Sequence, residues 1–170
     1  MNDADHACPP LQPEAQVRDD IGRLIAVSWH SAEGLAAGGA PWLAAVDGSD
    51  CSLRCVAMVL RLVAEGQGTL VDLVNVQPWL VKEAAETELS RRGWQATAQA
   101  RQLLDASSVG WRLHVVMGTP ASEIVRLAET LACRGIAIGS HGLTAAESLL
   151  MGSVAYKVVH LAKVPVLIVR

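Results

Sequence analysis

The amino-acid sequence predicts an α/β protein with an open, five-stranded parallel sheet and helices on both of its faces. Two observations predict this class. Of the 170 residues, 51% are hydrophobic, Phe is absent and Tyr occurs once, so the core must be aliphatic, as in layered α/β proteins. From residue 42 onward, short apolar runs alternate with segments of helical periodicity, and this alternation implies right-handed crossovers between parallel strands.

Five strands are expected along the chain, at residues 42–46, 70–76, 111–117, 135–138 and 164–169. The helix after the first strand has Ser49 or Asp50 as its cap and ends near Gly66 and Gly68. A long helical region over residues 80–106, with a weak point at Gly93, follows the second strand. Thr119 caps the next helix, with Pro120 at its first position, and the last helix covers residues 152–162.

The first 40 residues are less regular, and we treat residues 1–40 as an N-terminal extension of a domain that covers residues 41–170. Three prolines, Pro9, Pro10 and Pro13, indicate a loose tail at the start. Apolar positions between residues 17 and 28 follow helical spacing, although residues 23–29 could also form a strand, and we favour the helix. With a small-residue linker at 34–39, the extension is expected to be partly disordered or helical.

Composition and charge exclude several classes of function. The net charge is −3, the pI is near 5.9 and no run of Lys or Arg occurs, which argues against nucleic-acid binding. The apolar runs are far shorter than the roughly 18 residues that indicate a membrane span. We therefore expect a cytoplasmic protein without nucleic-acid or membrane partners. Cys51 and Cys55 lack a second cluster that would complete a zinc site, so we interpret them as buried free thiols.

A glycine-framed loop near the C-terminus is the strongest functional signal. Gly139 and Gly142 bracket Ser140 and His141, and Gly152 follows after nine residues, directly before Ser153. Glycines let backbone N–H groups approach a phosphate, and the start of a helix favours an anion. Considered alone, such glycines are also compatible with turn and cap chemistry. The ends of the first and fourth strands would bring Asp47 and Gly139 to one crevice if those strands are neighbours.

These residues resemble the universal stress protein family. The spacing of Gly139, Gly142 and Gly152-Ser153 matches the nucleotide-binding signature of its ATP-binding type. The segments Ala-Ala-Val-Asp-Gly-Ser (44–49), Leu-Val-Asn-Val-Gln-Pro (73–78) and Val-Pro-Val-Leu-Ile-Val (164–169) are similar to the family as well. The resemblance covers about residues 42–170 and implies a Rossmann-like fold, similar to the adenine nucleotide α-hydrolases, with strand order 3-2-1-4-5.

The resemblance also implies a function and a site. Family members with this motif bind ATP, some hydrolyse it slowly, and they act in stress responses. By position, the implied nucleotide site consists of Ala45, Asp47, Val76, Ile138, Gly139, His141, Gly142, Gly152, Ser153 and Val154. Two positions depart from the family. Ala155 stands where Ser or Thr is frequent, which removes one hydrogen bond to a triphosphate, a loss of about 0.5–1.5 kcal/mol. Asn75 stands where His is common, and we expect its side chain to point away from the nucleotide.

The leading hypothesis is a stress protein that binds ATP, or ADP or AMP, with Mg²⁺ accompanying the phosphates. Hydrolysis should be slow at most, because the sequence offers no dedicated base or arginine finger, and we assign no catalytic residue. The alternative is a nucleotide-independent, dimeric signalling or interaction protein of the same fold, with the extension as its binding arm. A hydrolase that uses Ser140 or His141 is disfavoured because the G-x-S-x-G elbow is missing.

The last expected strand predicts a partner. Residues 164–169 start at Val164 and end at Val169, are wholly apolar, and would form an edge of the sheet. Natural proteins seldom leave such an edge open. We therefore expect a homodimer in which this strand pairs with its copy in antiparallel fashion.

Overall fold

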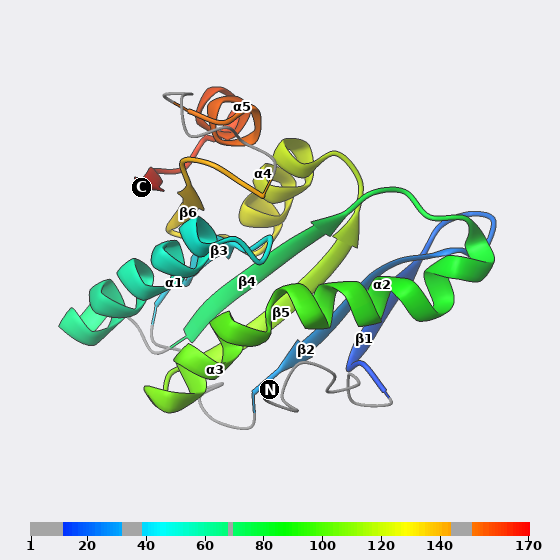
Figure 1. The fold of residues 1–170 in the computed structure, drawn as a ribbon, viewed down its shortest axis with the longest axis horizontal. Coiled ribbons are helices and arrows are strands. Elements are labelled where there is room, and N and C mark those ends of the chain that lie inside the picture. The colour runs from blue at the N-terminus through cyan, green and yellow to red at the C-terminus, as the bar shows by residue number, and fades with distance from the viewer. Residues whose placement is uncertain (1–11, 32–38, 68–69, 144–150) are drawn as a thin grey trace.

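The computed structural model describes residues 12–31, 39–67, 70–143 and 151–170. One sheet of seven strands, in the order β1-β2-β5-β4-β3-β6-β7, forms its centre (Figure 1). The strands are β1 (Ala15–Arg18), β2 (Leu24–His30), β3 (Trp42–Ala45), β4 (Leu70–Gln77), β5 (Gly110–Met117), β6 (Gly135–Gly139) and β7 (Val166–Val169). The helices are α1 (Asp50–Leu62) with a short π-helical turn η2 (Val63–Gln67), α2 (Lys82–Ala96), α3 (Ala98–Ala106), α4 (Pro120–Thr130) and α5 (Ser153–Leu161).

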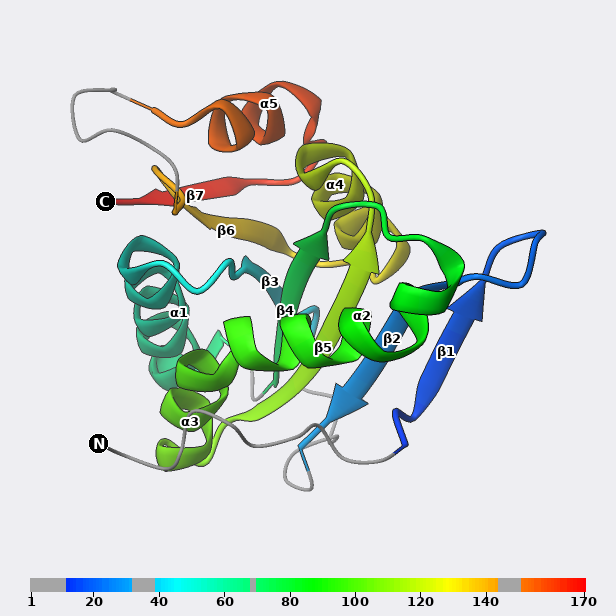
Figure 2. The ribbon, with the colours of Figure 1, turned by 45° about the vertical axis from the view of Figure 1, so that its right-hand side comes forward.

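The part of the sheet from β5 to β7 confirms the predicted fold class. Its strands are all parallel, and their order is that of the predicted third, second, first, fourth and fifth strands. Helices α1, α2 and α3 bury their apolar residues in a core on one face, and α4 and α5 form a second core on the other (Figure 2). Both cores are mainly aliphatic, as the composition indicated, and the buried Trp29 and Trp111 belong to the core under α1, α2 and α3.

The N-terminal segment differs from the prediction. Instead of a helix, it forms the hairpin of β1 and β2, which adds two antiparallel strands to the edge at β5, so the sheet has seven strands and not five. In β2, Val27 and Trp29 are buried toward α2, whereas Ser28 and His30 point to the other face. This period of two is the strand pattern, and pairing with β5 decided between the two local interpretations.

The hairpin belongs to the same sheet as the rest of the described chain. A division between residues 40 and 41 is therefore not marked by a separate sheet, and the domain boundary stays a prediction. The expected loose tail at residues 1–11 and most of the expected linker, residues 34–38, lie outside the described residues.

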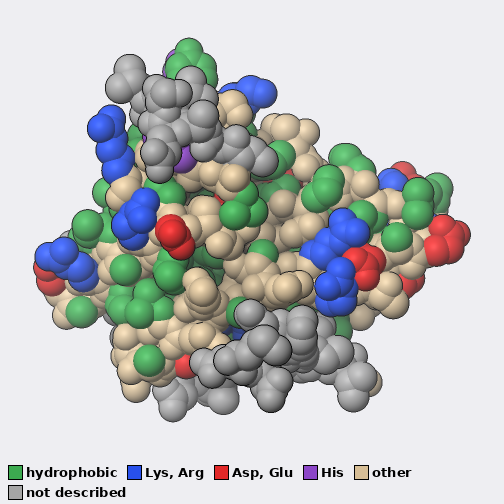
Figure 3. All heavy atoms as spheres, viewed as in Figure 1, with side chains coloured by type: hydrophobic (Ala, Val, Ile, Leu, Met, Phe, Trp, Pro, Cys, Tyr) green, Lys and Arg blue, Asp and Glu red, His purple; other side chains and the backbone are tan. Residues whose placement is uncertain are grey.

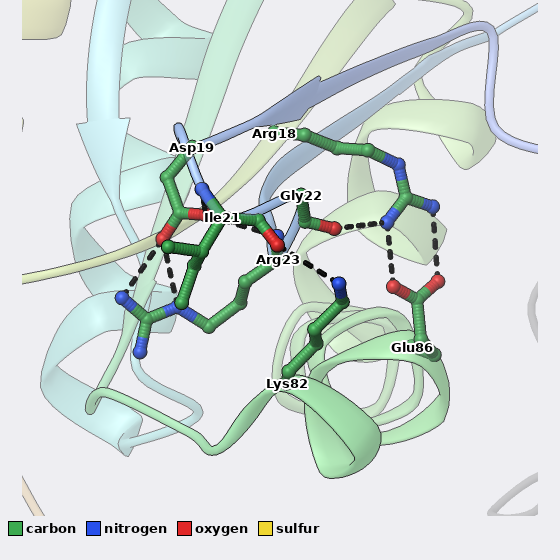
Figure 4. Close-up of polar contacts among 7 residues, drawn as sticks. All are labelled: Arg18, Asp19, Ile21, Gly22, Arg23, Lys82 and Glu86. Carbon is green, nitrogen blue, oxygen red and sulfur yellow. Dashed lines mark hydrogen bonds and ion pairs between the residues drawn. The ribbon is translucent and has the colours of Figure 1, made fainter.

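Polar contacts hold the tip of the hairpin to α2 (Figure 4). Arg18 forms a two-pronged ion pair with Glu86, at 2.5 and 3.0 Å, and Lys82 Nζ donates to the Ile21 carbonyl at 2.8 Å. Within the turn, Arg23 pairs with Asp19 at 2.8 Å. These groups are partly or largely exposed, so they contribute little stability and mainly define how the turn lies against the helix.

A tryptophan cluster buries the other end of the hairpin. Trp94 of α2 makes edge-to-face contacts with Trp29 of β2 at 5.4 Å and with Trp111 of β5 at 6.3 Å. The Arg101 guanidinium of α3 lies 3.4 Å from the centre of the Trp94 ring. Burial lowers the pKa of Arg101 to about 10, a value at which it still carries its charge at neutral pH. The cluster thus joins β2, β5, α2 and α3 into one packed unit.

The sequence indicated a weak point of the long helical region at Gly93. In the structure the break lies at Thr97 instead. Thr97 leaves the helical conformation, and its Oγ1 donates to the Gly93 carbonyl at 2.8 Å, which separates α2 from α3. Gly93 continues the helix and is buried against β5. A Cβ at this position would lie 2.3 Å from Val115 Cγ2, so the glycine permits close approach of helix and strand.

We predict that Gly93→Ala lowers stability although Ala is the better helix former. Helix propensity favours Ala by about 1 kcal/mol, but overpacking against Val115 costs about 1–3 kcal/mol. Thermal unfolding followed by circular dichroism should therefore show a lower Tm. The double variant Gly93→Ala/Val115→Ala should lose less stability than the two single changes added together. A higher Tm for Gly93→Ala would contradict the contact.

Charges are mixed on the face drawn in Figure 3. Basic side chains lie singly or beside acidic ones, with hydrophobic side chains scattered between them. On the described part of this face there is no continuous basic surface of the kind that nucleic-acid binders carry. Among the described residues, no helix combines the length and the apolar character needed to cross a membrane.

Candidate functional site

The site lies where the strand order of the parallel sheet reverses. From β3 the chain moves to β4 and β5 on one side, and later returns to β6 and β7 on the other. In open α/β sheets, ligands bind beyond the carboxyl ends of the strands at this point. A pocket of about 280 Å³ opens there, near the lower end of the ~300–1,000 Å³ usual for small-molecule sites.

All ten residues predicted for the site line this pocket. They are Ala45, Asp47, Val76, Ile138, Gly139, His141, Gly142, Gly152, Ser153 and Val154. They come from β3, β4, β6, α5 and the loops between them, so the fold brings together positions more than 100 residues apart. Their role in binding a nucleotide stays a prediction.

The lining also includes residues that the sequence did not indicate. Val74 lies two positions before Val76 on the same face of β4, so strand periodicity could have found it. Pro120 and Ile124 come from α4, and no local signal marks them because the contact depends on how that helix packs. Together with Ile138 these side chains make one wall of the pocket apolar. Asn75 points to the opposite face, where its Nδ2 donates to the Val46 carbonyl at 2.8 Å, as expected.

Asp47 connects the two loops at the mouth of the pocket. Its Oδ1 accepts hydrogen bonds from the Ser49 N–H at 3.0 Å and the Ser49 hydroxyl at 2.6 Å. Its Oδ2 accepts from the Leu143 N–H at 3.2 Å, across to the glycine-framed loop. Ser49 in turn caps α1, because its Oγ accepts from the Ser52 N–H at 3.2 Å. The carboxylate is therefore held in place from both sides of the crevice.

The glycine-framed loop is tightly packed on its inner side. The Ser140 N–H donates to the Val169 carbonyl of β7 at 2.7 Å, and the Gly152 N–H donates to the Ser140 carbonyl at 2.7 Å. A Cβ at Gly139 would lie 2.9 Å from Cys51 Sγ, and one at Gly142 would lie 2.7 Å from Asp47 Oδ2. Glycine is needed here for close approach and not for an unusual backbone angle. Residues 144–150 of this loop lie outside the described residues.

The first turn of α5 places backbone N–H groups at the pocket. Gly152 is the N-cap of the helix, and Gly152, Ser153, Val154 and Ala155 all line the cavity. The first N–H groups of a helix have no partner within it, and the helix dipole adds about half a positive charge at this end. This end of the pocket is therefore suited to an anion, and the apolar wall is suited to a flat ring.

A thiol, a hydroxyl and an imidazole lie close together at the start of the loop. Ser140 Oγ is 2.9 Å from His141 Nδ1 and 3.8 Å from Cys51 Sγ. Burial opposes ionisation of Cys51, but hydrogen bonds from the His141 and Ser140 backbone and the Ser140 side chain outweigh it and hold the pKa below its usual value. Cys51, Cys55 and Cys133 are free and buried, as expected for the first two. Burial raises the pKa of both Cys55 and Cys133 to about 12.

These differences predict the order in which the three described cysteines react. Because the thiolate is the nucleophile, Cys51 should be alkylated by iodoacetamide at neutral pH before Cys55 and Cys133. Peptide mass mapping after a short exposure measures this order, and a Cys51→Ser variant checks the assignment. Modification of Cys55 or Cys133 first would show that access, and not acidity, controls reactivity.

A doubly wound parallel sheet with a glycine-framed pocket at its switch point places the protein in the Rossmann-like α/β class. The sequence narrows this class further. The model of the universal stress protein family matches residues 42–170. Universal stress protein MJ0531 of Methanocaldococcus jannaschii is 30% identical over 132 residues, which cover 73% of this chain and 78% of the relative. The chain belongs to the universal stress protein family.

Solved structures agree on the fold. The universal stress protein of Archaeoglobus fulgidus in complex with dAMP matches with a TM-score of 0.62 and 22% identity, over 78% of this chain and 98% of that one. A family protein of Arabidopsis thaliana with AMP bound matches with a TM-score of 0.57 and 18% identity, over 76% and 90% of the two chains. The family match starts at residue 42, so the hairpin of β1 and β2 precedes it.

Proposed function

We propose that this protein binds an adenine nucleotide in the pocket at the switch point and acts in a stress response. The observation that carries the proposal is the meeting of the glycine-framed loop and the first turn of α5 around one cavity. Two proteins of the same fold have names that state bound dAMP and AMP, which supports the choice of an adenine nucleotide.

Each part of the nucleotide has a matching part of the pocket. The adenine ring lies against the apolar wall formed by Val76, Ile124 and Ile138. The ribose hydroxyls donate to Asp47, whose carboxylate is already oriented by Ser49. The phosphate accepts hydrogen bonds from the loop and from the free N–H groups at the start of α5.

ATP, ADP and AMP all contain the groups that this arrangement recognises. Mg²⁺ would enter on the phosphates of ATP or ADP, because the described residues contain no group of three His, Cys, Asp or Glu that could hold a metal. We expect hydrolysis to be slow at most. The described lining contains no Arg or Lys to stabilise charge in the transition state.

Two measurements test the proposal. Freshly purified protein is denatured by heat, and any released nucleotide is identified by chromatography. Adenine nucleotides are then titrated into nucleotide-free protein in a calorimeter. If no nucleotide is released and no isotherm appears at millimolar AMP, ADP or ATP, the proposal is wrong, and the nucleotide-independent interaction protein becomes the better hypothesis.

We further propose a homodimer formed by antiparallel pairing of β7. The outer edge of this strand is apolar, and the neighbouring helix α5 exposes Tyr156, Val159 and Leu161. The opposite edge, β1, has the same length as β7 but follows a proline and carries Arg18, features that protect an edge from pairing. Sedimentation equilibrium should show a dimer at micromolar concentration, and a monomer throughout would contradict this interface. The cytoplasmic location stays a prediction.

A further inference from the structure

A buried amide lies in the aliphatic core beside the turn that carries Asp47. Asn75 of β4 is only 3% exposed, and its neighbour on β5 is Val115, which belongs to the core under α1, α2 and α3. A buried polar group is costly unless hydrogen bonds satisfy it. An apolar residue would suit this central strand as well. The amide therefore needs an explanation beyond the formation of the strand.

Two hydrogen bonds fix the amide in one orientation. Asn75 Nδ2 donates to the Val46 carbonyl at 2.8 Å, and Asn75 Oδ1 accepts from Gln77 Nε2 at 2.6 Å. Because a carbonyl can only accept, Nδ2 must face Val46, which leaves Oδ1 to Gln77. Gln77 lies two positions further along β4, on the same face of the strand. The two side chains thus connect the end of β4 to the peptide bond that precedes Asp47.

The turn of residues 46–49 lies between two cavities. Val46 and Asp47 line the pocket of the candidate site. On the other side, a cavity of about 220 Å³ separates the turn from the junction of α2 and α3, and Val46, Gly48 and Ser49 line it. The turn approaches the junction closely only at Gly48, where a Cβ would lie 3.3 Å from the Ala96 carbonyl oxygen. Hydrogen bonds, more than packing, therefore determine where the turn lies.

Both backbone groups of Val46 are bound to β4. Its N–H donates to the Val74 carbonyl at 2.9 Å, and its carbonyl accepts from the Asn75 side chain. Val46 itself is 4% exposed, so its carbonyl has little access to water. Ser49 and Leu143 orient the carboxylate of Asp47, whereas the Asn75 amide orients the peptide from which that residue extends.

We infer that Asn75 is a positioning residue of the candidate site, which holds the Val46 peptide so that the Asp47 carboxylate reaches the ribose hydroxyls of a nucleotide. Gln77 supports this role because it fixes the direction of the amide. The contact with the ribose rests on the proposed function, but the positioning of the turn is a property of the protein without its ligand. When the amide is removed, the buried Val46 carbonyl loses its partner, and the turn shifts to satisfy it.

Substitutions at the two amides test the inference. Asn75→Leu removes the amide but keeps a side chain of similar size, and it should bind AMP at least about 5-fold more weakly than wild type. The affinity for 2′,3′-dideoxy-AMP, which lacks the ribose hydroxyls, should change by less than about 2-fold. Gln77→Met alters a partly buried residue outside the lining of the pocket, and it should cause a smaller loss of the same kind.

Val63→Ala is the matched control. Val63 is buried in the same core as Asn75's neighbour Val115, lies at the end of α1 and does not line the pocket. The change should lower Tm and leave the affinities for both ligands unchanged. Calorimetric titration of AMP and 2′,3′-dideoxy-AMP into the four proteins measures the ratio of the two affinities. A general loss of stability would not alter this ratio.

Amide hydrogen exchange measures the positioning without a ligand. In wild type, the N–H groups of Val46, Ser49 and Leu53 are hydrogen-bonded. In nucleotide-free Asn75→Leu, peptides that cover residues 46–53 should exchange faster than in wild type. The same peptides of Val63→Ala should exchange as in wild type. Unchanged exchange in Asn75→Leu would overturn the inference, whatever the affinities are.

The outcomes separate this inference from the proposed function. If wild type binds neither ligand, the proposed function fails, and hydrogen exchange alone decides whether Asn75 holds the turn. If wild type binds AMP but Asn75→Leu binds it equally well, or loses affinity for both ligands equally, the proposed function stands and the inference is overturned. Equal binding of both ligands by wild type also overturns it. If Asn75→Leu does not fold, Gln77→Met decides by the same ratio and the same exchange.

Discussion

A variant that combines Gly142→Val and Gly152→Val should bind adenine nucleotides at least about 100-fold more weakly than wild type while it keeps its fold. A Cβ at Gly142 would lie 2.7 Å from Asp47 Oδ2, and one at Gly152 would lie 3.1 Å from the Ser140 carbonyl oxygen. The added side chains displace the carboxylate and fill the space that a phosphate would occupy. Two or more hydrogen bonds to the phosphate are lost, each worth about 1.5–3 kcal/mol when one partner is charged.

The fold is expected to survive because neither glycine has a positive φ, so valine is compatible with the backbone at both positions. Calorimetric titration with AMP measures the loss, and circular dichroism and Tm report the fold. Gln102→Val is the control. It also introduces a valine, but Gln102 is an exposed residue of α3 that does not line the pocket. Native-like affinity in the double variant would mean that these glycines serve only the turn.

The largest loss of stability is expected for Asp72→Ala. Asp72 is fully buried in β4, and its carboxylate accepts two hydrogen bonds from Arg112, both at 2.7 Å, and one from His114 at 3.0 Å. Removal of one partner from a buried pair leaves the remaining charge without compensation, which costs about 3–5 kcal/mol. We expect about 3 kcal/mol, because the side chains of Arg112 and His114 retain some contact with water.

The effect should depend on pH. Burial opposes ionisation of Asp72, but the hydrogen bonds and charges of His114 and Arg112 outweigh it and hold its pKa below the usual value. The stabilisation is therefore complete above the unfolded-state pKa of about 3.9 and is lost as the pH falls toward the lower folded-state pKa. Urea unfolding of wild type and Asp72→Ala should show a large difference near pH 7 that shrinks below pH 4.

Two further variants test whether the loss of stability comes from the burial of the Asp72–Arg112 ion pair or from the removal of any carboxylate. Glu88→Gln removes a partly exposed surface carboxylate that pairs with Arg91 and Arg92, and its Tm should stay close to that of wild type. The double variant Asp72→Leu/Arg112→Met should be more stable than Asp72→Ala, because an apolar pair leaves no unpaired charge. Equal losses of stability for Asp72→Ala and Glu88→Gln would show that burial does not increase the contribution of the Asp72 ion pair.

Where sequence reasoning succeeded, the signal was local and repeated. Strands β3 to β7 are short apolar runs bounded by turn residues, so the core of the fold was predictable. The N-terminal hairpin was not, because residues 17–28 fit the helical and the extended period about equally well. Its state was decided by pairing with β5, more than 80 residues away along the chain.

The residues of the site also divide into those that local sequence predicted and those that depend on contacts between distant segments. The glycines, Ser153 and Asp47 were identified from spacing and from the family resemblance, and they line one pocket. Pro120 and Ile124 were missed because nothing in α4 itself marks the side that faces the pocket. The ion pair of Asp72 and Arg112 was missed too, because it depends on the register between β4 and β5.

From residue 42 onward, the sequence by itself determined the succession of strands and helices, the family and the positions that frame the pocket, because periodicity, turn residues and a spaced motif are properties of neighbouring residues. Tertiary structure alone decided that the hairpin pairs with β5 and that the long helix breaks at Thr97. It also decided how closely Gly93 approaches Val115 and which charged groups meet around Asp72 and in the pocket. The physical reason is that burial and electrostatic energies depend on which distant segments come into contact.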